Sequence, residues 1–186
     1  MDIQNFIQAY DSVLPEKPFN HFIKYCNIIN FEKSKVVKKN QGSEENFNIR
    51  RTYIKNLSNR SPSMTETHWT NVLLSRFNII FSNYLEKFAP DSDVIIRDIA
   101  VLKYETNGFY NWHADHCKEA PRTLSAIYML NNNYEGGNLC FKFGDKEKVM
   151  DVVPNRIIVW PSNFLYYHTV KPVTKGTRYS VVSWAL

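Results

Sequence analysis

The feature that most constrains the fold is a change in the residue pattern after position 93. From there to the C-terminus, short runs rich in β-branched and aromatic residues alternate with turn-forming residues. Seven short strands at this spacing indicate an all-β sandwich or barrel. The runs are DVIIRDIAVLKYE, TLSAIYML, NLCFKF, KVMDVV, RIIVW, LYYHTV and RYSVVSWAL. The turn signals between them are Asn107-Gly108, Asn131 to Asn133, Gly136-Gly137, Gly144-Asp145, Pro154-Asn155 and Lys175-Gly176.

The first 92 residues show a helical period instead. In residues 18–29, apolar residues recur at three- and four-residue steps, which predicts a helix with one buried face. A stronger helical pattern follows in residues 69–88. We expect Thr65 or Thr67 to cap this second helix and Glu66 to lie in its first turn. An Ala-Pro-Asp sequence should end it.

The segment between the two helical patterns is polar and has no clear period. We expect a short strand near Val36-Val37 and a second strand in IRRTYIKNL. Residues 33–48 could form a lid over a site or a plain solvated loop. The 186 residues suit one domain, in which a mostly helical layer, residues 1–92, packs on a β core, residues 93–186.

Composition excludes several classes of protein. With 23 basic and 18 acidic residues, the net charge of +5 is too small and too scattered to indicate a nucleic-acid-binding protein. The three cysteines, Cys26, Cys117 and Cys140, are too widely spaced for a disulfide framework or a Cys-x-x-Cys metal site. The N-terminus lacks a signal-peptide pattern, and no apolar stretch reaches the length of a membrane span. We therefore expect a cytoplasmic protein with no membrane partner.

The stretch FYNWHADH places two histidines and an aspartate within four residues. If YNWHAD ends a strand, His113 and Asp115 lie on one face, because successive side chains point to opposite faces. His116 then faces away and binds no metal. The imidazole and the carboxylate could hold a metal together, but they would need a third ligand from a distant strand.

His168, in the late run LYYHTV, is the histidine that a β core could bring opposite His113. The remaining histidines, His21 and His68, lie on the helical layer. Two histidines and one carboxylate form the facial triad of non-haem Fe(II) oxygenases. Taken alone, however, His168 could equally be a hydrogen-bonded core residue.

Arg178 and Ser180 follow His168 in the run RYSVVSW and share one face of that strand. An arginine that faces into a β core is costly unless it meets an anion. A guanidinium matches both oxygens of a carboxylate, and a neighbouring hydroxyl adds a further hydrogen bond. The alternative is an arginine on the outer face of a surface strand.

Together these residues resemble the Fe(II)/2-oxoglutarate-dependent dioxygenases, in particular the prolyl 4-hydroxylase-type enzymes with their bacterial and phage relatives. The resemblance rests on His113-x-Asp115, on His168, and on Arg178-x-Ser180 ten residues later. It covers about residues 95–186. The motifs that support it are RTLSAIYMLN, YEGGNLCF and VWPSNFLYYHTVKPVTKGTRYSVVSW.

The resemblance implies a fold and a chemistry. The fold would be a double-stranded β-helix, or jelly roll. His113, Asp115 and His168 would bind Fe(II), and Arg178 with Ser180 would hold the far carboxylate of 2-oxoglutarate. With O2 as oxidant, such an enzyme hydroxylates a C–H bond and releases succinate and CO2. The resemblance leaves open whether ascorbate is required.

The family also suggests roles for other side chains. Tyr104 and Tyr110 resemble the tyrosines that line the cosubstrate and substrate pocket, although both could be core residues. Trp184 matches an aromatic residue near the pocket, where a core role is equally plausible. In the oxygen-sensing branch a tyrosine on the AIYML strand helps to hold the far carboxylate. Our alignment places Met129 there, with Tyr128 on the opposite face.

The substrate implied by the resemblance is a prolyl residue of a peptide or protein. Another residue, a free amino acid, a small metabolite or a nucleic acid are the alternatives within the wider superfamily. Arg122 and Trp112 flank the metal strand and could touch substrate, but a structural role is the simpler interpretation. A catalytically silent β-helix binding module is the main competing hypothesis. The sequence carries no signal for a particular oligomeric state.

Overall fold

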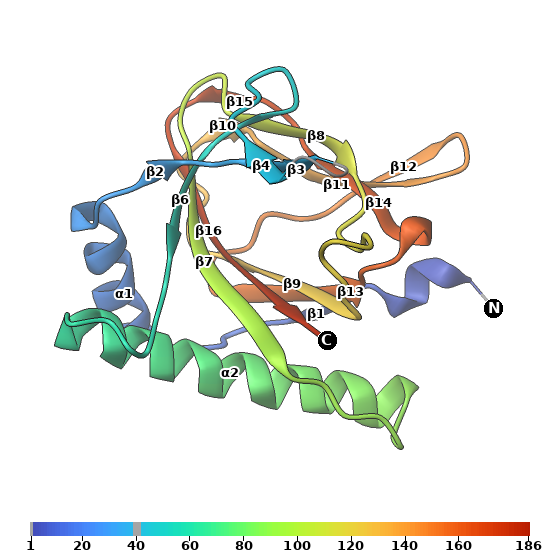
Figure 1. The fold of residues 1–186 in the computed structure, drawn as a ribbon, viewed down its shortest axis with the longest axis horizontal. Coiled ribbons are helices and arrows are strands. Elements are labelled where there is room, and N and C mark those ends of the chain that lie inside the picture. The colour runs from blue at the N-terminus through green and yellow to red at the C-terminus, as the bar shows by residue number, and fades with distance from the viewer. Residues whose placement is uncertain (1, 39–41) are drawn as a thin grey trace.

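The computed structural model describes residues 2–38 and 42–186 as two facing β-sheets, with two helices packed against the larger sheet (Figure 1). Residues 39–41, within the segment that we interpreted as a lid or loop, lie outside the described residues. No helix in the described part of the chain combines the length and apolarity needed to cross a bilayer.

The larger sheet has seven antiparallel strands and lies between the helices and the smaller sheet (Figure 1). Its central strand, β16, pairs with β7 on one side and β9 on the other. In spatial order the strands are β1 (Gln8–Tyr10), β13 (Arg156–Pro161), β9 (Leu124–Met129), β16 (Arg178–Ala185), β7 (Ile96–Tyr104), β6 (Tyr53–Asn56) and β2 (Glu32–Lys33).

The smaller sheet has five strands and covers the other face of the larger one. In spatial order these are β12 (Lys146–Val149), β11 (Leu139–Phe143), β14 (Tyr167–Val170), β8 (Phe109–His113) and β5 (Arg50–Arg51). Two short pairs and two 3-10 turns complete the fold: β3 (Val36–Lys38) with β4 (Gly42–Glu44), β10 (Glu135–Gly136) with β15 (Val173–Lys175), η1 (Ile3–Phe6) and η2 (Phe164–Tyr166). The predicted two-sheet β core is confirmed.

Both predicted helices form, as α1 (Glu16–Ile28) and α2 (Met64–Phe88). The predicted cap of α2 is wrong. Ser63 caps the helix, because its side-chain oxygen accepts the backbone N–H of Glu66. The backbone N–H of Thr67 already bonds to the carbonyl of Ser63, so Thr67 lies inside the helix.

The N-terminal half is less helical than the sequence pattern suggests. It adds β1, β2 and β6 to the larger sheet and β5 to the smaller one. These are strands of two to four residues, too short to show a period of two in the sequence. The N-terminal half therefore helps to build both walls of the β core.

The strand predicted in KVMDVV lies earlier in the structure, at Lys146–Val149. Its position follows from the tight turn at Gly144-Asp145, which places Phe143 opposite Lys146 and Cys140 opposite Val149. Turn geometry sets the register of a hairpin. The apolar residues after Val149 therefore fall outside the strand.

Two apolar clusters stabilise this arrangement. One lies between the helices and the larger sheet and contains Phe22, Trp69 and Phe77. The other lies between the two sheets and contains Phe141 and Trp160. The second cluster surrounds the side chains discussed below.

Two adjacent isoleucines on α2 allow the helix–sheet contact to be tested. The side chain of Ile80 is 6% exposed, whereas that of Ile79 is 49% exposed. We expect Ile80→Ala to lower the free energy of unfolding by roughly 2–5 kcal/mol, because it removes buried methyl groups and leaves a cavity. Ile79→Ala should change it by less than about 0.5 kcal/mol. Denaturant titration of both variants measures the difference, and equal effects would contradict the packing of α2 on the sheet.

Candidate metal centre and active site

Neighbouring strands bring the two predicted histidines together. β8 and β14 run antiparallel in the smaller sheet, and His113 is the direct register partner of His168. Their rings lie 4.2 Å apart between centroids. The prediction that the β core would place His168 opposite His113 is confirmed.

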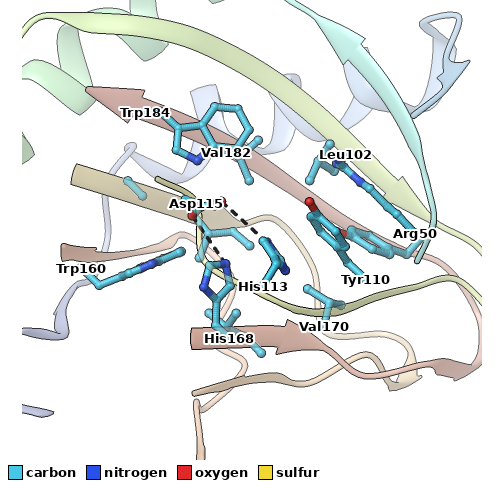
Figure 2. A pocket seen from close by; sticks show the side chains of 14 residues that line it. Arg50, Leu102, Tyr110, His113, Asp115, Trp160, His168, Val170, Val182 and Trp184 are labelled. Atoms are coloured by element: carbon cyan, nitrogen blue, oxygen red, sulfur yellow. Dashed lines mark ion pairs between the residues drawn. The ribbon is translucent and has the colours of Figure 1, made fainter. Parts of the chain in front are cut away.

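Asp115 lies beside the two histidines, but the backbone that places it there is not the strand that the sequence predicted. Strand β8 ends at His113, and Asp115 lies in the bend that follows rather than on the strand. Its Oδ1 lies 3.6 Å from Nε2 of His113, and its Oδ2 lies 3.5 Å from Nε2 of His168. The three ligand atoms lie within 4.8 Å of one another (Figure 2).

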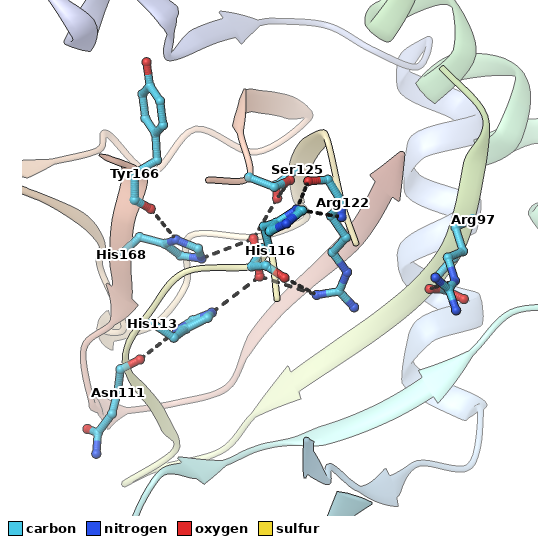
Figure 3. A network of polar contacts seen from close by, with 11 residues as sticks. Arg97, Asn111, His113, His116, Arg122, Ser125, Tyr166 and His168 are labelled. Atoms are coloured by element: carbon cyan, nitrogen blue, oxygen red, sulfur yellow. Dashed lines mark hydrogen bonds and ion pairs between the residues drawn. The ribbon is translucent and has the colours of Figure 1, made fainter. Parts of the chain in front are cut away.

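Backbone carbonyls fix the proton on each imidazole. Nδ1 of His113 lies 2.7 Å from the carbonyl oxygen of Asn111, and Nδ1 of His168 lies 2.9 Å from that of Tyr166 (Figure 3). A carbonyl only accepts, so both Nδ1 atoms must donate. In the neutral rings both Nε2 atoms then carry a free lone pair, and both face Asp115.

Burial and neighbouring groups keep His168 and Asp115 in the protonation states that a metal needs. Burial, with a smaller contribution from His113, lowers the pKa of His168 to about 4, so its ring is neutral near pH 7. Burial alone would raise the pKa of Asp115. The neighbouring His168, His113 and Arg122 outweigh burial and hold that pKa below its usual range, so the carboxyl is ionised. Neutral imidazoles and a carboxylate are the forms that bind metal ions.

One serine hydroxyl bonds directly to Asp115, and a second serine hydroxyl bonds to the first. Ser125 donates a 2.7 Å hydrogen bond to Oδ2 of Asp115, and its oxygen also lies 2.7 Å from that of Ser162. Ser125 and Ser162 are 1% exposed. The sequence did not indicate this pair, because a buried serine carries no signal until the group that it contacts is known.

His116 faces away from the triad, toward the loop that follows Asp115. Its Nδ1 lies 2.8 Å from the backbone oxygen of Arg122 and 3.2 Å from the backbone nitrogen of the same residue (Figure 3). The loop thus held places Nη1 of Arg122 3.7 Å from Oδ1 of Asp115. The guanidinium of Arg122 also stacks 3.8 Å above the ring of Trp184.

Arg178 and Ser180 share the inner face of β16, as predicted. Arg178 is 1% exposed and donates a 2.9 Å hydrogen bond from Nη1 to the hydroxyl of Ser180. Its Nε is buried without a hydrogen-bond partner among the described residues. The guanidinium lies 5.1 Å from the centre of the Tyr104 ring, and Tyr104 is its register partner on β7.

Gly137 lets the chain pass close to this arginine. It has a φ of +63°, and a Cβ atom built there would lie 3.1 Å from Cδ of Arg178. Gly136 beside it has a φ of +72°. Both glycines thus adopt backbone angles that glycine favours, although Gly136 belongs to strand β10 rather than to the turn that the sequence indicated.

Strand β9 places Met129 and Tyr128 on opposite faces. Met129 pairs with Ser180 and belongs to the cluster between the sheets. Tyr128 belongs to the cluster under the helices, and its hydroxyl donates to Oδ1 of Asn155 at 2.7 Å. Met129, rather than a tyrosine, is therefore the residue beside Ser180.

The triad opens into a small pocket between the two sheets (Figure 2). The predicted residues Tyr104, Tyr110 and Trp184 line it, whereas Trp112 does not and stacks on Tyr167 instead. The lining residues are Arg50, Leu102, Tyr104, Tyr110, His113, Asp115, Ala126, Ile127, Leu139, Trp160, His168, Val170, Val182 and Trp184. Arg50 also lines the pocket, and the sequence did not indicate this charged residue.

Comparison with known proteins agrees with this geometry. Residues 99–186 match the family model of the 2OG-Fe(II) oxygenase superfamily. Residues 99–186, a little under half of the chain, are therefore similar to the 2OG-Fe(II) oxygenase superfamily. The match contains the complete triad together with Arg178 and Ser180.

Several relatives with similar sequences are PKHD-type hydroxylases. The chain is 34% identical to a PKHD-type hydroxylase of Synechococcus sp. (strain CC9902) over 110 residues, which are 57% of this chain and 48% of the relative. It is 32% identical to a PKHD-type hydroxylase of Gloeothece citriformis over 95 residues, covering 48% of this chain and 42% of the relative. The chain thus spans about half the length of the curated relatives that it matches.

Solved structures of the superfamily share the fold over nearly the whole chain. A prolyl hydroxylase from Trichoplax adhaerens, in complex with a hypoxia inducible factor peptide fragment, superposes with a TM-score of 0.78 at 18% identity, covering 98% of this chain and 84% of that one. A Pseudomonas putida prolyl-4-hydroxylase gives a TM-score of 0.70 at 19% identity, covering 96% and 91%. These likenesses support the double-stranded β-helix fold.

The residues present fit the groups that 2OG-Fe(II) oxygenases hold. His113, Asp115 and His168 offer the donor set of a facial Fe(II) site, with both Nε2 lone pairs directed inward. Arg178 offers a buried guanidinium with an unused N–H, which fits the far carboxylate of 2-oxoglutarate.

The hydrogen bond from Ser125 to Asp115 should matter for metal affinity. We expect Ser125→Ala to weaken Fe(II) binding roughly 10- to 100-fold, because an outer hydrogen bond orients the carboxylate. Ser183→Ala is the matched control, since the Ser183 hydroxyl is equally buried but has no partner among the described residues. Anaerobic calorimetric titration with Fe(II) measures both variants. Equal affinities for Ser125→Ala and the unsubstituted protein would contradict a role for this contact.

Proposed function

We propose that the protein is an Fe(II)- and 2-oxoglutarate-dependent dioxygenase that hydroxylates a prolyl residue of a peptide or protein. The arrangement of the triad carries this proposal: two imidazoles with their Nδ1 protons fixed by carbonyls direct both Nε2 atoms at one carboxylate. When bound, the metal and 2-oxoglutarate supply the oxidation of a C–H bond by O2, with release of succinate and CO2.

Each side chain has a defined task in this scheme. His113, Asp115 and His168 would hold the metal through two imidazoles and one carboxylate. Arg178 and Ser180 bind the far carboxylate of 2-oxoglutarate through charge-assisted hydrogen bonds. The reacting groups are thereby held next to each other.

The walls of the pocket exclude water from the reaction. Trp160, Tyr110 and Trp184 surround the triad with aromatic surface. Arg122 stacks on Trp184 and contacts Asp115, so it links the pocket wall to a metal ligand. A dry, fixed site protects a reactive oxidant from side reactions.

Two likenesses favour a prolyl substrate. The curated relatives are PKHD-type hydroxylases, and the solved structures include a prolyl hydroxylase with a peptide fragment. The proposal extends that substrate class to this chain.

The test is 2-oxoglutarate turnover with and without a proline-rich peptide. Protein loaded with Fe(II) and 2-oxoglutarate without oxygen is exposed to O2, with and without ascorbate. Succinate is quantified, and the peptide is analysed by mass spectrometry for one added oxygen. We expect succinate and hydroxylated peptide in equal amounts, and neither product in His168→Ala.

The outcomes separate the competing hypotheses. Succinate that forms without any modified peptide would support an oxygenase but contradict this substrate. Failure to bind Fe(II) and 2-oxoglutarate would contradict the oxygenase and favour a silent β-helix binding module.

A further inference from the structure

Arg50 is a buried cation without a counter-ion. It is 9% exposed and lines the pocket together with the triad. Within residues 2–38 and 42–186, no carboxylate forms an ion pair with it, and its Nε is buried without a hydrogen-bond partner. Burying a charge in this way is costly unless an anion arrives to pair with it.

Strand pairing directs Arg50 into the pocket. On β5 it is the direct register partner of Tyr110 on β8, and its guanidinium lies 4.6 Å from the centre of the Tyr110 ring. The backbone N–H of Arg50 also donates to the carbonyl of Asn46. The neighbouring Arg51 is exposed. The strand therefore selects one of two adjacent arginines for the pocket.

A continuous stack joins Arg50 to the metal triad. The ring of Tyr110 lies between them and stacks on His113 at 3.6 Å between centroids (Figure 2). Arg50 is thus separated from a metal ligand by the thickness of one aromatic ring. A group that meets Arg50 would lie close to the carbon that is oxidised.

The other two arginines of the site have partners. Arg122 contacts Asp115. Arg178 donates to Ser180 and is assigned to the far carboxylate of 2-oxoglutarate. Asp115 is the one carboxylate among the residues that line the pocket, and Arg122 already contacts it, while the charges of Fe(II) and the 2-oxoglutarate dianion would cancel each other. A positive excess remains, and Arg50 is the cation whose partner is missing.

We propose that Arg50 binds a carboxylate of the substrate next to the position that is hydroxylated. This inference rests on the proposed function and adds a requirement for an anionic substrate. The carboxylate could belong to an acidic residue beside the proline of a peptide, or to the α-carboxylate of a free amino acid. Complementary charge would then set specificity, since an uncharged analogue leaves Arg50 buried and unpaired.

Matched pairs of probes test the requirement for a carboxylate. One pair is a capped prolyl peptide with aspartate on each side of the proline, and the same peptide with asparagine there. The other pair is L-proline and L-prolinamide. Binding to protein loaded with Fe(II) and 2-oxoglutarate is measured by calorimetry without oxygen, so no turnover takes place.

We expect the carboxylate member of at least one pair to bind about 10-fold or more tightly than its amide partner. The pair that shows the preference identifies the source of the carboxylate. Arg50→Gln should abolish the preference, and Arg50→Lys should retain part of it. Arg51→Gln, which removes the same charge from the exposed neighbour, should leave it unchanged.

Three results would overturn the inference. The unsubstituted protein could bind both members of each pair equally, or bind no probe at all. Alternatively, Arg50→Gln could weaken the binding of 2-oxoglutarate itself, which would assign Arg50 to the cosubstrate. Succinate formation by the unsubstituted protein in the absence of any probe would show that the proposed oxygenase holds even where the requirement for a carboxylate fails.

Discussion

His168→Ala is expected to abolish specific Fe(II) binding and, with it, the formation of succinate. His168 is 5% exposed, and its Nε2 lies 3.5 Å from Oδ2 of Asp115. Without this imidazole, two ligands remain in place of a facial set of three. The loss of affinity should exceed the roughly 10- to 100-fold that removal of an outer hydrogen bond costs. Anaerobic calorimetric titration with Fe(II) measures the affinity directly.

His116→Ala is the matched control for this prediction. His116 is the neighbour of Asp115 in sequence, but its ring bonds to the backbone of Arg122 rather than joining the triad. We expect its removal to loosen the 116–122 loop while Fe(II) affinity stays far above that of His168→Ala. Equal losses in the two variants would contradict the assignment of ligands.

Arg178→Ala should raise the KM for 2-oxoglutarate by at least about 100-fold. Removing one partner of a buried ion pair costs roughly 3–5 kcal/mol, because the other charge is left buried and unpaired. The far carboxylate of 2-oxoglutarate is that second charge in the proposed site. Fe(II) affinity in the absence of 2-oxoglutarate should change little, since Arg178 contacts no triad residue in the described structure.

Arg178→Lys separates the loss of charge from the loss of packing. Lysine keeps the cation but presents no planar pair of donors, so the KM should rise by less than in Arg178→Ala. Steady-state succinate formation at varied 2-oxoglutarate concentrations measures both variants. An unchanged KM in Arg178→Ala, with the fold intact by circular dichroism, would show that another residue binds the cosubstrate.

The triad could be predicted because its residues lie at positions in the sequence that a β core brings together. His168 lies in a run that the apolar pattern identified, whereas the strand of His113 was assumed, and the pairing of β8 with β14 joins the two histidines. Arg178 and Ser180 obey the two-residue alternation of β16. The alternation of side chains applies at these positions because each residue lies within a regular strand.

Asp115 shows where this kind of argument is weaker. We placed it on the same strand face as His113, but the strand ends first and a bend carries Asp115 to the triad. The predicted contact is present, although the reason given for it was wrong. The prediction of the residue that caps α2 was also wrong. Ser63, Thr65 and Thr67 are all acceptable capping residues, and only the backbone geometry selects Ser63.

Arg50 could not be singled out from the sequence. It lies in a two-residue strand beside Arg51, and two residues are too few to tell an inward face from an outward one. Only the pairing with Tyr110 shows that Arg50 faces the pocket. Long-range strand pairing, which depends on the whole fold, therefore determines the residue on which our specificity proposal rests.

The central claim is that His113, Asp115 and His168 form one site with Arg178 for a metal and an organic dianion. Anaerobic calorimetric titration of 2-oxoglutarate, with and without Fe(II), tests it most directly. We predict binding that is tight with Fe(II), much weaker without it, and lost in both His168→Ala and Arg178→Ala. Binding that is independent of Fe(II), or unchanged in either variant, would contradict the claim.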